Sequence, residues 1–281
     1  MHKCRILLAL PLSVCLLAPA GAQLRQPPPY RILVTNDDGV RAPGIAAIAQ
    51  ILQLVGTPII VAPADNQTAK SHSAVTTEPI FRQDVTLPNG LRAIGLTATP
   101  ATTVGIAIRN IVMPRPDLVV SGINSEYNLG LSAYYSGTVA AAREAALQGI
   151  PAIAASLSGA APGDLVFAAE EVFGVARRVK QYGLPLNTFL NVNVPPMPAG
   201  GYKGYMITTQ APVRGGQENF VEMKHPSGRT LYWSQYAERS TTAQPQGTDI
   251  WAVENGYVSV TPMRLGETDA SQLDALRAIF K

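Results

Sequence analysis

The chain has 281 residues, which suits one large domain or two small ones. Its apolar-rich composition, with 15% charged residues, excludes the intrinsically disordered class. The formal net charge of +3 is weak and depends on basic residues at the N-terminus.

The first 22 residues have the layout of a secretory signal peptide. Lys3 and Arg5 precede an apolar run at 6–18, and the sequence AGA at 20–22 offers a cleavage site between small residues. The run is short for a membrane span. We expect cleavage after Ala22 and export to the periplasm, with no membrane contact afterwards. The alternative is a buried N-terminal strand or helix.

Cleavage at this site would change both the charge and the cysteine content. Without Lys3 and Arg5, 20 basic residues remain against 19 acidic ones, so charge indicates neither a nucleic-acid polymer nor an anionic membrane as partner. Cys4 and Cys15 leave with the peptide. The mature chain is therefore free of cysteine, and its catalysis must rest on oxygen, nitrogen or a metal.

Strand and helix patterns alternate after a proline-rich linker at 23–30. Short apolar runs predict strands at 31–34, 58–62, 91–96, 116–121, 151–156 and 189–194. Helical spacing predicts helices at 43–55, 101–111, 139–147 and 163–182. This alternation indicates an α/β fold with a Rossmann-like, doubly wound and mostly parallel sheet.

The pattern changes at about residue 196. Segments that alternate or are rich in aromatic residues predict β-hairpins, at 204–210, 219–224, 229–236 and 256–262. A short helix is expected at 271–280. We interpret this part as a C-terminal β-hairpin extension of one domain, 31–281, that can serve as an oligomerisation arm.

Oxygen-bearing side chains follow the predicted strands at the points where the strands end. They are Thr35, Asn36, Asp37 and Asp38, then Asp65, Asn66 and Thr68, then Thr97, Thr99 and Thr102, and then Ser121, Asn124 and Ser125. In an open parallel sheet, ligands bind outside the carboxyl ends of the strands. We therefore expect a binding site along this edge.

Four of these residues form a hard-oxygen ligand set. Asp37, Asp38, Thr68 and Asn124 would offer two carboxylates, a hydroxyl and an amide oxygen, which suit Mg²⁺, Mn²⁺ or Ca²⁺. A cation would also neutralise the repulsion between the adjacent aspartates. The alternative is that the aspartates cap the following turn and helix.

Two further features suggest a phosphate site. Ser136, Gly137 and Thr138 begin an alanine-rich helix, whose N-terminus can bind an anion, although an ordinary helix cap is the alternative. His72 is a candidate proton donor or phosphate ligand near Thr68, or else a solvated loop residue.

Several of these stretches resemble the SurE survival-protein family. The resemblance is carried by TNDDG at 35–39, PDLVVSGIN at 116–124, NLG at 128–130, YSGTVAAA at 135–142, LNVNVP at 190–195 and GYVSVTP at 256–262, and it extends over about 31–263. It implies a Rossmann-like phosphomonoesterase that depends on a divalent metal and hydrolyses nucleoside 5′- and 3′-monophosphates. It also implies a homodimer or homotetramer with swapped C-terminal segments.

The resemblance places the metal ligands of the family at Asp37, Asp38 and Asn124, with Thr68 in place of its serine. One divalent cation per subunit, Mg²⁺ or Mn²⁺, is then expected. Asp37, Asp38 and Asn124 are the expected catalytic residues, with Asp37 accepting a proton from water. The expected phosphate and substrate residues are Asn36, Asn66, His72, Ser73, Ser136, Gly137 and Thr138.

Besides Thr68, and Ala69 where the family has a glycine, two positions around the pocket depart from the family pattern. Thr102 stands where the family often has an acidic residue, and Leu131 follows NLG where acidic residues are common. Both departures concern the pocket around the metal site and therefore the preference for a nucleoside. A broad phosphatase or exopolyphosphatase and a catalytically weak exported nucleotide- or metal-binding protein are the alternative functions.

Overall fold

The computed structural model describes residues 28–158, 162–197, 201–214, 217–237 and 243–280. The predicted signal peptide at 1–22 and most of the predicted linker at 23–30 lie outside these residues. Within the described ranges, no helix is both long and apolar enough to cross a membrane.

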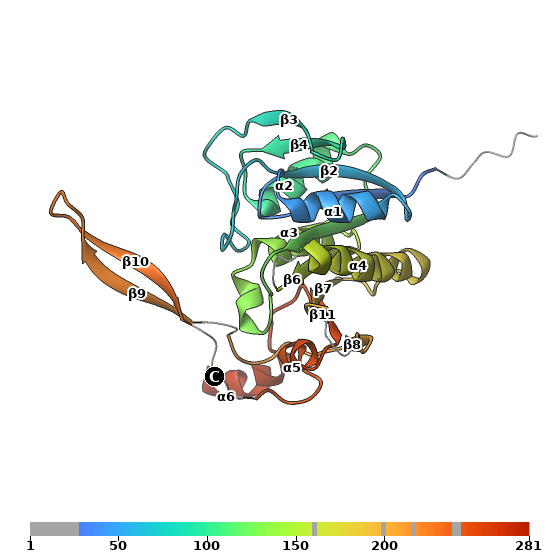
Figure 1. Ribbon diagram of the computed structural model, residues 1–281. Coiled ribbons are helices and arrows are strands. Elements are labelled where there is room, and N and C mark those ends of the chain that lie inside the picture. Colours follow the sequence, from blue (N-terminus) through green and yellow to red (C-terminus); the bar gives the residue numbers. More distant parts are fainter. Residues whose placement is uncertain (1–27, 159–161, 198–200, 215–216, 238–242, 281) are drawn as a thin grey trace, which may run out of the picture.

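A nine-stranded sheet forms the centre of the molecule (Figure 1), with the strand order β3-β4-β2-β1-β5-β6-β7-β11-β8. The strands are β1 (Arg31–Thr35), β2 (Thr57–Pro63), β3 (Arg82–Thr86), β4 (Arg92–Leu96), β5 (Leu118–Asn124), β6 (Ala152–Leu157), β7 (Thr188–Val194), β8 (Tyr205–Ile207) and β11 (Val258–Arg264). Only the β3–β4 and β7–β11 pairs are antiparallel. The predicted mostly parallel α/β sheet is confirmed.

The chain winds outward in both directions from the centre of this sheet. β1 pairs with β2 on one side and with β5 on the other, so the strand order reverses between β1 and β5. Such a reversal is a topological switch point, where ligands bind in doubly wound folds. The register pairs Thr35 with Ser121, which brings the segments that follow these two residues side by side.

Helices cover both faces of the sheet. α1 (Pro43–Leu52) and α4 (Pro162–Tyr182) pack together on one face. The other face is covered by α2 (Pro100–Ile106), which continues as a π-helical turn (Ala107–Ile111), and by α3 (Gly137–Leu147). Alternate residues of β1 enter the two cores, Ile32 beneath α1 and Leu33 beneath α3. Burial on both faces explains why the strand is apolar throughout.

The predicted helices are confirmed with small shifts of their ends. The helix predicted at 43–55 ends at Leu52, and the helix predicted at 139–147 begins at Gly137. At the C-terminus, a 3₁₀ turn (Ala270–Gln272) precedes α6 (Leu273–Ile279).

The C-terminal part differs from the prediction in two ways. β9 (Gln217–Lys224) and β10 (Thr230–Ala237) form an antiparallel hairpin that projects from the body, as expected (Figure 1). β8 and β11, however, are not a hairpin but extend the main sheet, because Val258 and Val260 are buried in the core beside β7. The helix α5 (Asp249–Glu254) was also unexpected, although the Thr248 hydroxyl caps it by accepting a bond from the Trp251 amide.

Candidate metal and phosphate site at the switch point

Asp37 is held at the end of β1 by the N-terminus of α3. Its side chain is 2% exposed, and its Oδ1 accepts a hydrogen bond from the Thr138 hydroxyl. The backbone amides of Gly137 and Thr138 also favour its ionised form. A Cβ atom at Gly137 would lie 2.7 Å from the Asp37 Cβ, so only glycine permits this close approach.

The two adjacent aspartates have raised pKa values. Burial raises the pKa of Asp37 despite the amides and the hydroxyl that face it. Burial, together with the charges of Asp37 and Glu126, raises the pKa of Asp38 to about 6. In the described part of the chain, no lysine or arginine pairs with either carboxylate. The pair therefore lacks a positive partner.

The two aspartates do not cap α1, which was the alternative interpretation. The N-cap of α1 is Ala42, and no side chain bonds to it. Asp38 instead receives a hydrogen bond from the backbone amide of Ser125, at the end of β5. Asp37 and Asp38 are thus directed at α3 and β5, across the switch point.

Asn124 lies beside the aspartates at the end of β5. It is 8% exposed, and its side-chain nitrogen donates to the Glu126 carbonyl over 2.6 Å. Its Oδ1 is therefore the atom that a cation would take. Asn36 precedes Asp37, is fully buried and donates to the Gly39 carbonyl over 2.9 Å, while its Oδ1 has no hydrogen-bond partner. Asn36 therefore shapes the turn that carries the two aspartates.

Thr68 lies in the segment after β2, and hydrogen bonds of the adjacent residues hold this segment next to Asp37. The Gln67 amide donates to the Asp37 carbonyl over 2.7 Å, and the Thr68 amide donates to Asn66 Oδ1 over 2.7 Å. Asn66 and Thr68 are exposed. Their side chains are thus at the surface of the site, whereas the aspartates form its base.

The same segment is fixed to α3 by His72. The His72 Nε2 lies 3.1 Å from Glu144 Oε2, and the side chains are 25% and 17% exposed. Glu144 also accepts a bond from Gln148, and His72 and Gln148 hold the pKa of Glu144 below its usual value although burial opposes them. In this arrangement, His72 fastens the segment to α3.

Thr102 also holds this segment. Its Oγ1 accepts a hydrogen bond from the Val75 amide at 2.9 Å and lies 3.0 Å from the Thr99 hydroxyl oxygen, to which it can donate its own proton. Ser73 is exposed, its hydroxyl donates to Lys70, and its carbonyl accepts from Thr99. The other departure, Leu131, begins a 3₁₀ turn (Leu131–Tyr134) and is 36% exposed.

The start of α3 is both an ordinary helix cap and an anion-binding helix terminus, the two interpretations made from its sequence. The Ser136 hydroxyl accepts a bond from the Val139 amide over 3.1 Å and so acts as an ordinary N-cap. The anion that the helix terminus holds in this structure is the Asp37 carboxylate, bonded by Thr138. The Ser136 hydroxyl retains its proton for donation to a ligand.

The donor set has the chemistry that a divalent cation requires. One buried and one half-buried carboxylate, both with raised pKa values, one amide oxygen and a nearby hydroxyl are hard ligands without sulfur or imidazole. Among the described residues, no group of three or more His, Cys, Asp or Glu side chains is placed to hold a metal. A cation here would rely on mixed oxygen ligands and water.

A prediction on stability follows from Asp38. Because the folded protein binds the Asp38 proton more tightly than the unfolded chain, this stabilisation is complete below about pH 4 and is lost as the pH rises through 6. Asp38→Asn should therefore raise the Tm of the metal-free protein at pH 8, but not at pH 4. Since Asp38 is partly solvated, we expect about 1 kcal/mol, or roughly 2–4 °C.

The measurement is a thermal melt in EDTA at both pH values. Glu267→Gln serves as the control because Glu267 is an exposed carboxylate of the C-terminal segment. A lower Tm for Asp38→Asn at pH 8 would contradict the assignment of Asp38 as a strained, unpaired charge.

A buried amide network was missed from the sequence. The Asn128 amide donates to Asn193 Oδ1 over 2.8 Å, the Asn128 side chain donates to Ser156 over 2.7 Å, and Asn191 donates to the Asn128 carbonyl over 2.8 Å. This network fixes the segment after Asn124 to β6 and β7. The sequence does contain a sign of this network, because Asn191 and Asn193 alternate with apolar residues in a strand that is otherwise apolar.

Known proteins resemble this chain over most of its length. The sequence profile of the family described as "Survival protein SurE" matches residues 32–216. A protein from Symbiobacterium thermophilum named 5′-nucleotidase SurE is 41% identical over 249 residues, covering 88% of this chain and 96% of its own. One of the same name from Geobacter sulfurreducens is 42% identical over 252 residues, covering 88% and 92%.

A solved structure matches as well. The crystal structure of the SurE protein from Aquifex aeolicus superposes with a TM-score of 0.76 at 35% identity, over 89% of this chain and 100% of its own. The resemblance expected from the motifs is confirmed, and both relatives carry the name of an enzyme.

Proposed function

This chain belongs to the SurE family, and on that premise we propose that it is a divalent-metal-dependent phosphomonoesterase that hydrolyses nucleoside 5′- and 3′-monophosphates. The observation that supports this most is the meeting of Asp37, Asp38 and Asn124 at the switch point, with the two carboxylates lacking a positive partner among the described residues. Uncompensated negative charge at the ligand-binding edge of the sheet is what the binding of a catalytic cation requires.

The residues of the site have distinct roles in this proposal. Asp37, Asp38, Asn124 and Thr68 would hold a single Mg²⁺ or Mn²⁺ ion. When bound, such an ion polarises a phosphoryl oxygen and acidifies water. The raised pKa of Asp37 suits it to accept the proton of the attacking water. The exposed Asn66 and the Ser136 hydroxyl would donate to phosphate oxygens.

Phosphate release tests this function directly. The chain from Gln23 onward is incubated with AMP, GMP, 3′-AMP, p-nitrophenyl phosphate or polyphosphate, in Mg²⁺, Mn²⁺ or EDTA. We expect release from AMP and GMP that EDTA abolishes and added metal restores. A folded sample that releases no phosphate with any metal would contradict the proposal and favour a binding protein.

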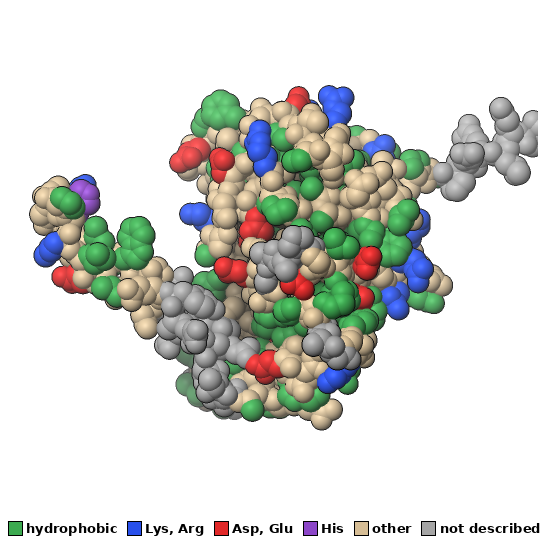
Figure 2. Space-filling view, in the orientation of Figure 1, with side chains coloured by type: hydrophobic (Ala, Val, Ile, Leu, Met, Phe, Trp, Pro, Cys, Tyr) green, Lys and Arg blue, Asp and Glu red, His purple; other side chains and the backbone are tan. Residues whose placement is uncertain are grey.

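We also propose that the β9–β10 hairpin joins copies of this chain. Its strands pair only with each other among the described residues, and Phe220, Tyr232 and Trp233 are each 65% exposed. Figure 2 shows hydrophobic side chains gathered on this arm, away from the body. An isolated two-stranded hairpin is marginally stable in water, so a second copy is the expected partner.

Trp233→Ser should therefore lower the molar mass measured by light scattering at micromolar concentration. We expect the wild type at two or four times the subunit mass and the variant shifted toward the monomer, because the aromatic side chain is lost from the contact. Leu186→Ser is the matched control, since Leu186 is 92% exposed outside the hairpin. A monomeric wild type would exclude the interface.

A further inference from the structure

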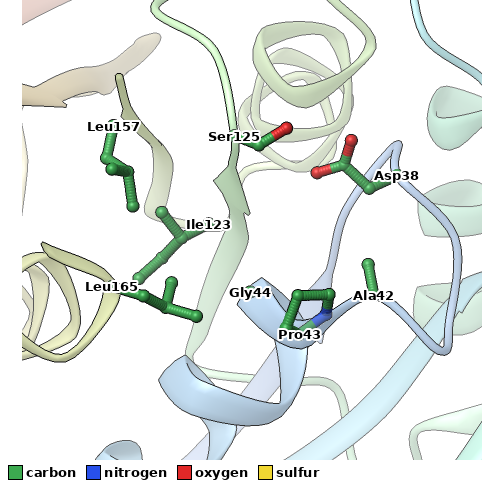
Figure 3. A pocket seen from close by; sticks show the side chains of 8 residues that line it. All are labelled: Asp38, Ala42, Pro43, Gly44, Ile123, Ser125, Leu157 and Leu165. Atoms are coloured by element: carbon green, nitrogen blue, oxygen red, sulfur yellow. The ribbon is translucent and has the colours of Figure 1, made fainter. Parts of the chain in front are cut away.

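Thr68 is positioned differently from the other proposed metal ligands. Asp38 lies just beyond β1 and Asn124 ends β5, and Figure 3 shows Asp38 and Ser125 directed toward one another. The sheet itself therefore fixes this side of the site. Thr68, in contrast, lies in an exposed segment beyond the end of β2. Contacts of that segment must hold the Thr68 hydroxyl in place.

The backbone that follows Thr68 is strained. Ala69 and Ser71 have φ angles of 58° and 51°, in the left-handed region that residues with a Cβ atom avoid. Among the described residues, only one other non-glycine residue, Asn187, has a positive φ, and asparagine tolerates this conformation. We call residues 69–71 the strained turn. Such a turn keeps its shape only where surrounding contacts impose it.

Ser71 makes two of these contacts, and both reach the loop that leads into α3. Its hydroxyl donates a hydrogen bond to the Tyr134 carbonyl over 2.7 Å, and its amide donates to the Tyr135 carbonyl over 3.0 Å. The next residue of that loop is Ser136, the N-cap of α3. Ser71 thus ties the segment that carries Thr68 to the start of α3.

The residues on either side of the strained turn are held without the help of Ser71. The Gln67 amide donates to the Asp37 carbonyl over 2.7 Å, and His72 Nε2 lies 3.1 Å from Glu144 Oε2 of α3. Neither contact involves an atom of the strained turn. Without the Ser71 hydroxyl, the turn could therefore relax between two fixed ends, and Thr68 would move with it.

We propose that Ser71 is a positioning residue, which holds the Thr68 hydroxyl at the candidate metal site through the strained turn. The inference rests on the proposed function and adds a residue that acts on metal affinity. A ligand that is held in place before the ion arrives binds it more tightly, because less freedom is lost on binding. Loss of the Ser71 hydroxyl should therefore weaken metal binding more than it slows turnover at saturating metal.

Ser71→Ala is expected to raise the Kd for Mn²⁺ about fivefold, because one hydrogen bond that holds the turn is lost. The Kd is measured by titration calorimetry without substrate. The kcat for AMP at saturating Mn²⁺ should stay close to that of the wild type. Ser271→Ala is the matched control, since the Ser271 hydroxyl is exposed and bonds only within its own turn, to Asp269. It should keep the wild-type Kd.

Ala69→Gly tests whether the strain links Ser71 to Thr68. Glycine adopts a positive φ without a steric cost, so the turn has less tendency to relax when the hydroxyl is absent. The double variant Ala69→Gly/Ser71→Ala should therefore bind Mn²⁺ within about twofold of the wild type. Ala69→Gly alone should keep the wild-type Kd. A merely structural role of Ser71 would change the Tm in EDTA but not the Kd for Mn²⁺.

The outcomes separate this inference from the proposed function. An unchanged Kd in Ser71→Ala, or a raised Kd that Ala69→Gly does not correct, overturns the positioning role while metal-dependent hydrolysis stands. If no substrate is hydrolysed, the calorimetric comparison still decides, and a raised Kd that Ala69→Gly corrects supports the role of Ser71. A folded wild type that binds no Mn²⁺ overturns the inference together with the metal site.

Discussion

Asp37→Asn is expected to reduce phosphate release by about 10³-fold or more while the protein stays folded. Asparagine keeps the size of the side chain but removes its charge. It also brings an NH₂ group toward the Thr138 hydroxyl and the amides at the start of α3, which donate to the carboxylate. The variant therefore loses a cation ligand and the proton acceptor at once.

Asp37→Asn should not lower the thermal stability of the metal-free protein, although it lowers the activity. The wild-type carboxylate is buried and its pKa is raised, so removing its charge relieves a cost of folding in the metal-free protein. We expect a Tm in EDTA that is equal to or above that of the wild type. A site that is costly in the empty state and needed for turnover is typical of catalytic centres.

The measurement is kcat for AMP across a range of Mn²⁺ concentrations, with a thermal melt as the folding control. Asp84→Asn is the matched variant, since Asp84 is a carboxylate on the edge strand β3 and is 68% exposed. It should keep wild-type rates. If Asp37→Asn recovers the wild-type rate at high Mn²⁺, Asp37 is neither the proton acceptor nor an essential ligand.

The strands and helices around the site could be predicted because local pattern decides them. β1 and β5 are buried on both faces, so their sequences are continuous apolar runs that end in polar residues. In a parallel sheet those ends share one edge, which is why Asp37, Asp38 and Asn124 were expected together. Connectivity alone was enough to place them.

Pairing between distant segments could not be predicted in the same way. β11 has the alternating pattern of a hairpin strand, yet it pairs antiparallel with β7 and parallel with β8. The edge strand β3 (RQDVT) has one buried residue, Val85, and therefore no periodic signal. In both cases the partner strand, not the segment itself, determines the structure.

Contacts between single side chains that are far apart in the chain could not be predicted from the sequence either. His72 pairs with Glu144, which is 72 residues away, and Thr102 accepts from Val75 across 27 residues. Both contacts position the segment that carries Thr68. The change to Thr102 therefore does not leave a gap in the structure, because its hydroxyl holds this segment in place.

Gly137→Ala is expected to lower kcat for AMP about 100-fold, although nothing in the local sequence forbids it. Alanine is favourable in a helix, and Gly137 begins α3 without needing a positive φ. The added Cβ, however, would lie 2.7 Å from the Asp37 Cβ, 2.8 Å from its Oδ2 and 3.0 Å from Pro100 Cγ. Either Asp37 or α3 must move, and a displacement near 1 Å can cost about 10² in rate.

The control for this variant is Gly163→Ala, near the start of α4, where a Cβ would meet no atom within 4 Å. It should keep full activity. For Gly137→Ala, overpacking should also cost about 1–3 kcal/mol of folding free energy, measured by urea unfolding. Full activity in a folded Gly137→Ala protein would show that the contact between α3 and Asp37 is not needed for turnover. The expected loss would instead mean that this contact sets the position of Asp37, since the substitution leaves every proposed ligand atom in the chain.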